Sequence, residues 1–151
     1  MSPLASSFFQ LNANARRRVH FRLAALALEQ WETFCTNNGT IKYRDSVVGL
    51  THVLDPRLPG DAINASRSDQ VVTSVRQRYL EPIVAMQDDD LESVLPSNVQ
   101  FAYYGIYNLF NKYAEQDSQI DDWLIVNQCL SSLPESTWDS VLHQAIAEAE
   151  N

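Results

Sequence analysis

The chain has 151 residues, of which 45% are hydrophobic and 20% are charged, and its net charge is −8. This length and apolar content exclude a disordered chain and predict one domain that buries its own core. With only 4 Gly and 6 Pro, the chain lacks the frequent turn residues of an all-β sandwich.

The first helix is expected at about residues 14–36, ending at the Asn38-Gly39 pair. Residues 1–12 before it are left as a flexible N-terminal tail within a single helical domain that spans 1–151. A second helix is expected over 43–54, with Val47, Leu50, Val53 and Leu54 facing inward. The segment 55–60 follows this helix and contains two prolines and a glycine, so it is predicted to be a strong break between helices.

A third helix is expected from about Ser68 to Leu80, with Pro82 either kinking it or restarting it. A fourth is expected from Ser97, which forms a capping box with Gln100, to about residue 115. The last two are expected to begin near 118 and after 132 or 136. No period-2 run is apparent, so the prediction is an all-α, single-domain bundle of five to seven helices.

The stretch Phe101–Phe110 has five aromatic residues in ten positions. Helical phasing places Ala102, Ile106, Leu109 and Phe110 on a core face. The opposite side carries the aromatics Phe101 and Tyr104, together with Gly105, which permits close approach of another segment, and Tyr107 lies on the boundary between the two faces. Either neighbours wrap this helix on most sides, or the three aromatics form an exposed binding patch.

The charge is divided unevenly along the chain. Residues 1–85 contain ten basic and seven acidic residues, a net of +3, whereas residues 86–151 contain one basic and twelve acidic residues, a net of −11. A half with a single lysine does not neutralise phosphates, so no nucleic-acid partner is expected. The acidic half either attracts a basic protein surface or serves solubility. The arginines at 16–18 and 22 oppose the helix dipole and are expected to pair within the fold.

No motif for catalysis, cofactor binding or metal binding is apparent. The three histidines, at 20, 52 and 143, have no second histidine or cysteine at metal spacing. The acidic runs 88–90 and 121–122 lack the ligand spacing of a calcium loop. Cys35 and Cys129 are interpreted as buried thiols. The order of charges at the N-terminus does not match a secretion signal, and no apolar run is long enough to span a membrane, so a soluble, cytoplasmic protein is expected.

In size, acidity, helical character and lack of catalytic motifs, the chain resembles the small helical immunity proteins that bacteria pair with polymorphic toxins. The resemblance implies a protein that neutralises a toxin domain with a basic surface by occluding it, without chemistry of its own. The alternatives are a helical regulatory or scaffold subunit, and an enzyme with a dispersed carboxylate site. The expected partner-binding residues are Asp88, Asp89, Asp90, Glu92, Phe101, Tyr104, Tyr107, Asp117, Asp121 and Asp122. The oligomeric state is left open.

Overall fold

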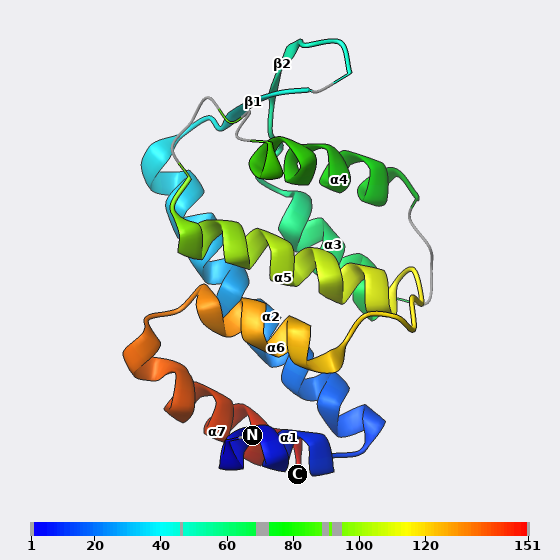
Figure 1. Cartoon of the computed structure of the whole chain (residues 1–151), viewed down its shortest axis with the longest axis vertical. Helices are drawn as coiled ribbons and strands as arrows, with labels where there is room; N and C mark the ends of the chain where they lie inside the picture. The colour runs from blue at the N-terminus through cyan, green and yellow to red at the C-terminus, as the bar shows by residue number, and fades with distance from the viewer. Residues whose placement is uncertain (1, 46, 69–72, 89–90, 92–94, 151) are drawn as a thin grey trace.

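A computed structural model of the chain describes residues 2–45, 47–68, 73–88, 91 and 95–150. These residues form seven α-helices and one short two-stranded sheet, which confirms the expected all-α class (Figure 1). The elements are α1 Pro3–Gln10, α2 Ala13–Asn38, β1 Lys42–Arg44, β2 Thr51–Val53, α3 Leu58–Arg67, α4 Thr73–Gln87, α5 Ser97–Tyr113, α6 Asp122–Ser131, the 3-10 turn η1 Glu135–Thr137 and α7 Trp138–Ala149.

The core is built around α2 and α5, which pack against each other. Helix α5 also contacts α3, α4 and α6, so it is wrapped by neighbours on most of its sides. Ile106, Leu109 and Phe110 are fully buried, as the helical phasing predicts. Gly105 allows α6 to approach closely, because a Cβ at this position would lie 2.8 Å from Cys129 Sγ. The expected close approach at Gly105 is therefore confirmed.

Helix α2 begins and ends close to its predicted bounds. The Asn12 side chain accepts a hydrogen bond from the Ala15 N–H at 2.8 Å, which caps the first turn. Gly39 follows the last turn with a φ of 72°, a left-handed conformation that glycine adopts without steric cost. The apolar pattern located the buried side of α2 but missed His20, which is fully buried on it.

Residues 43–54 do not form the predicted helix. They form an antiparallel hairpin in which β1 and β2 pair Tyr43 with His52. Gly49 in the connecting turn has a φ of 71°, and Asp45 caps that turn through its side chain, so the segment folds back on itself. As a result, the predicted inward positions Val47, Leu50 and Val53 are 90%, 60% and 63% exposed; only Leu54 of the predicted set is buried.

The predicted break at 55–60 is also too long. Helix α3 begins at Leu58, and Pro59 occupies its first turn, where a missing N–H costs no hydrogen bond. Helix α4 continues through Pro82 as one element rather than restarting there. Leu80, given as the end of the third predicted helix, lies within α4 and is 41% exposed. The Ser68-Asp69 start of the third predicted helix lies partly outside the described residues, and Ser68 itself caps the end of α3.

The two termini lie close together, at the end of the molecule opposite the hairpin (Figure 1). Residues 3–10 form α1 and bury Phe8, where the sequence left a flexible tail. The predicted capping box at Ser97 is wrong, because Pro96 occupies the N-cap and the Gln100 side chain donates to the Leu95 carbonyl. The last helix was expected to be capped by Ser132 or Ser136, but its N-cap is Thr137, whose hydroxyl donates to the Pro134 carbonyl and makes no capping bond. Among the described helices, none is both long and apolar enough to cross a bilayer.

Candidate functional site

A groove of about 490 Å³ lies between the hairpin and α4. One wall comes from the hairpin through Val47, Val48 and His52. The other comes from α4 through Gln77, Leu80, Glu81 and Val84, which share one helix face because they follow three- and four-residue steps. Apolar side chains therefore flank a floor that carries ionisable groups.

Asp45 organises the hairpin turn at the bottom of this groove. Its Oδ1 accepts hydrogen bonds from the backbone N–H groups of Val47, Val48 and Gly49 at 3.1, 2.7 and 3.1 Å. Its Oδ2 lies 2.6 Å from His52 Nε2. These bonds, first that of the Val48 N–H and then that of His52, lower the pKa of Asp45 to about 2, so its carboxylate is ionised at neutral pH.

His52 lies between two carboxylates. Besides its contact with Asp45, its Nε2 is 3.7 Å from Glu81 Oε1 on α4. The Tyr43 ring stacks on the imidazole with a centroid distance of 5.4 Å. Burial raises the pKa of Tyr43 to about 12, and the charge of Glu81 and its hydrogen bond add to this effect. The neutral tyrosine thus supports one side of the imidazole, while both acids reach its Nε2.

Exposed apolar side chains concentrate on the same hairpin. Of the seven large hydrophobic residues that are exposed in the described part of the chain, four lie on the hairpin and a fifth, Leu80, faces it across the groove. Val53 lines a second hollow, of about 250 Å³, together with Ile41 and Cys35. The hairpin therefore presents apolar surface both toward α4 and away from it. Such a concentration is typical of a binding surface.

The three predicted aromatic residues are brought together in another hollow, of about 390 Å³, between α4, α5 and α6. Phe101 is 38% exposed, whereas Tyr104 and Tyr107 are half-buried. The Tyr107 ring stacks on Tyr79 with a centroid distance of 5.3 Å, so it is partly core. Of the two alternatives for this helix, wrapping by neighbours describes most of it, and the aromatic edge left open is small.

Among the predicted acidic residues that the structure describes, none lines that hollow. Asp88 is exposed just after α4, and Asp89, Asp90 and Glu92 lie outside the described residues. Asp117 and Asp121 are exposed beyond the other end of α5, where each accepts a hydrogen bond from a backbone N–H two residues later. Asp121 is thereby the N-cap of α6. These two aspartates also have structural roles in the connection between α5 and α6.

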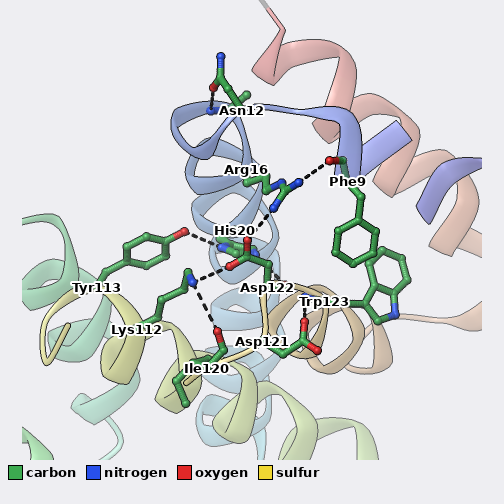
Figure 2. A network of polar contacts seen from close by, with 11 residues as sticks. Phe9, Asn12, Arg16, His20, Lys112, Tyr113, Ile120, Asp121, Asp122 and Trp123 are labelled. Carbon is green, nitrogen blue, oxygen red and sulfur yellow. Dashed lines mark hydrogen bonds and ion pairs between the residues drawn. The ribbon is translucent and has the colours of Figure 1, made fainter. Parts of the chain in front are cut away.

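Asp122 belongs to a network inside the fold (Figure 2). Its carboxylate lies 3.2 Å from Arg16 Nη1 and 2.6 Å from Lys112 Nζ, so it joins α2, α5 and α6. Its backbone carbonyl accepts from His20 Nε2 at 2.8 Å, and the other imidazole nitrogen lies 2.7 Å from the Tyr113 hydroxyl. The Arg16 guanidinium also donates to the Phe9 carbonyl of α1.

Two other arginines of α2 also meet the C-terminal half. Arg18 donates to the Ala149 carbonyl at 3.0 Å from Nε, and Arg22 pairs with Glu148 at 3.4 Å. The expectation that the α2 arginines pair within the fold is therefore confirmed for these residues and for Arg16. These contacts with carbonyl and carboxylate oxygens offset the unfavourable placement of cations at a helix N-terminus.

Sequence reasoning missed the residues of the hairpin groove. Asp45, His52 and Glu81 come from the turn, from β2 and from α4, and no spacing in the sequence links them. The signal that was present is local: Asp45 and Gly49 are residue types that are common in turns.

No family model matches the chain, and no curated protein or solved structure matches it either.

Proposed function

We propose that this is a protein-binding module, acting as an immunity protein that occludes a bacterial toxin domain, and that its hairpin and α4 form the contact surface. The observation that carries the proposal is the concentration of exposed apolar side chains on the hairpin. Val47 and Val48 are 90% and 67% exposed, and the hairpin lies at the end of the molecule opposite the termini (Figure 1). A valine pair this exposed gains free energy when a partner covers it.

The charges of this surface favour a partner with basic residues. Asp45 and Glu81 form the floor of the groove, Asp88 is exposed at the end of α4, and the chain as a whole has a charge of −8. A lysine or arginine that enters between the apolar walls would reach these carboxylates. Complementary charge of this kind speeds association, and desolvated apolar contacts slow dissociation. A protein that must hold a toxin inactive in the cytoplasm needs both fast association and slow dissociation.

The aromatic hollow on the far side of α4 extends the same surface. Ile83 and Gln87 of α4 line it with Phe101 and Tyr104 of α5. Because α4 contributes to both hollows, one partner can contact the hairpin and the aromatic edge together. Partly exposed aromatic residues are frequent anchors of protein interfaces.

The direct test uses co-expression with the toxin domain encoded beside this gene. Cells should survive with the parent protein and die with Val47→Asp, because a carboxylate placed in the apolar contact lowers affinity by at least about tenfold. The matched control is Leu124→Asp, which adds the same charge at a side chain that is 38% exposed on α6, outside the groove. Circular dichroism confirms that both variants fold.

Two outcomes would overturn the proposal. Equal death of toxin-expressing cells with and without the parent protein would remove the immunity function. Equal rescue by Val47→Asp and the parent would remove the hairpin from the interface. A stable complex with a cellular protein that is not a toxin would instead support a regulatory subunit, and light scattering of the protein alone would show whether the apolar surface pairs two copies of the chain.

A further inference from the structure

The geometry points to a binding site for one divalent transition-metal ion, held by Asp45 Oδ2, His52 Nε2 and Glu81 Oε1 at the floor of the hairpin groove. The sequence analysis did not predict this site. The inference does not rest on the proposed function, because the metal ion can be tested on the protein alone.

The three donor atoms already converge. Asp45 Oδ2 is 2.6 Å and Glu81 Oε1 is 3.7 Å from His52 Nε2, and all three atoms lie within 4.8 Å of one another. Ligands around a tetrahedral Zn²⁺ are about 3.4 Å apart, given bond lengths of about 2.0–2.2 Å to nitrogen and carboxylate oxygen. The distance between His52 Nε2 and Asp45 Oδ2 would therefore have to increase by only about 0.8 Å for an ion to replace the proton that the two atoms share. Glu81, with a side chain that is 44% exposed, can rotate to complete the set.

The site is also held in place by its surroundings. Three backbone N–H groups of the turn bind Asp45 Oδ1, which fixes the carboxylate and leaves Oδ2 directed at His52. The Tyr43 ring stacks on the imidazole and restricts its orientation. Contacts of this kind, which orient a metal ligand through its other atoms, are regular features of metal sites in proteins.

The local charge favours a cation. Within the described part of the chain, His52 is the partner of Asp45 and of Glu81 in the ion pairs that these two carboxylates make. Two carboxylates thus face a single imidazole, and the cluster is negative whether His52 is neutral or protonated. A nitrogen and two carboxylate oxygens suit Zn²⁺ and neighbouring first-row ions. Three protein ligands leave a coordination position that faces the groove, where water or a side chain of a bound partner can enter.

Isothermal titration with ZnCl₂ tests the site. The parent is expected to bind one Zn²⁺, and Glu81→Gln should bind at least about tenfold more weakly because one ligand is lost while the side-chain size is kept. His52→Ala should lose the site. His143→Ala and Cys35→Ser are the matched controls, since both residues lie away from the groove and offer other metal-binding atoms; both variants should bind as the parent does.

A second measurement separates loss of the site from loss of the fold. Zn²⁺ should raise the melting temperature of the parent, because it links the hairpin to α4, and at the same Zn²⁺ concentration should raise that of Glu81→Gln less. Co²⁺ should give visible absorption bands without the near-ultraviolet band of a thiolate ligand. Absence of one-site Zn²⁺ binding by the parent would overturn the proposal. Equal Zn²⁺ binding by Glu81→Gln and the parent would also overturn the proposal, because Glu81 would then not be a ligand of the ion.

Discussion

Acidification should destabilise the protein through His20 before its carboxyl groups are protonated. His20 is fully buried, with Nε2 donating to the Asp122 carbonyl and Nδ1 accepting from the Tyr113 hydroxyl (Figure 2). This arrangement satisfies both nitrogens of a neutral imidazole. Burial is the main cause that lowers the pKa of His20 from 6.5 to about 4. The Asp122 carbonyl and carboxylate oppose this effect, whereas Lys112 and Arg16 add to it.

The sign and the size of the effect follow from linkage. A histidine with a lower pKa in the folded state takes up its proton in the unfolded state first, so stability falls as pH falls from 6.5 toward 4. A difference of about 2.5 pKa units corresponds to about 3 kcal/mol, a large part of the stability of a domain of this size. Above pH 6.5 the imidazole is neutral in both states, and its contribution is constant.

Three carboxyl groups have a pKa below this window. Hydrogen bonds lower the pKa of Asp45 to about 2, and the pKa of Asp55 and Asp122 is also below the usual 3.8. Carboxyl groups with a lowered pKa contribute stability above 3.8 and lose it as pH falls further. These three carboxyl groups therefore add little to the change in stability between pH 6.5 and 4, and a variant that lacks His20 isolates the contribution of the imidazole.

Urea unfolding followed by tryptophan fluorescence, at steps of half a pH unit from 7 to 4, measures the effect. The reference is His20→Gln, which has an amide to replace both hydrogen bonds and no titrating group. The parent should lose about 3 kcal/mol more than this variant across the interval. Equal losses would refute the reasoning, as would an NMR titration of the His20 ring with a midpoint near 6.5.

Two further predictions concern packing around α5. Gly105→Ala should destabilise the fold by about 1–3 kcal/mol, because its Cβ would lie 2.8 Å from Cys129 Sγ and 3.2 Å from the Cys129 backbone N. The matched control is Gly60→Ala in α3, where the added methyl group would have no atom within 4 Å, so this variant should be neutral or stabilising. The midpoints of urea unfolding compare the two variants. Equal midpoints would contradict the close contact at Gly105. Tyr79→Phe should cost about 1 kcal/mol, because the buried hydroxyl donates to the Tyr103 carbonyl at 2.6 Å. An unchanged urea midpoint for this variant would show that the bond makes no net contribution.

The long helices could be predicted because their apolar stripes repeat over many turns. The phasing of α5 identified Ile106 and Leu109 correctly, since a core face repeated over 17 residues outweighs single exceptions. The apolar pattern of α6 is a weaker guide, because this helix has only 10 residues. The apolar steps Ile120, Leu124, Val126 or Asn127, and Leu130 predict its stripe; Val126 and Leu130 are buried, whereas Leu124 is 38% exposed.

The hairpin could not be predicted from spacing alone. Val47, Leu50, Val53 and Leu54 follow the steps of a helix, and the same residues are compatible with two short strands. The turn decides between them, because Asp45 binds three N–H groups and Gly49 takes a positive φ. The groove could not be predicted either, since it depends on where α4 lies relative to the hairpin.

The two ends of the molecule differ in how they use charge. At the end with the termini, Arg16, Arg22 and Lys112 pair with Asp122 and Glu148, so part of the acidic half is neutralised within the fold. An acid held between two cations contributes less to attracting a partner than the sequence count of −11 for residues 86–151 implies.

At the hairpin end, Asp45 and Glu81 share one histidine beside apolar walls. Excess negative charge and exposed apolar area thus coincide at the hairpin, although both acids lie in the half of the chain with a net charge of +3. We therefore propose the hairpin and α4, rather than the acidic half, as the binding surface. Charge reversal at Glu81 should consequently slow association with a basic partner more than charge reversal at Asp122, which would mainly disturb the fold.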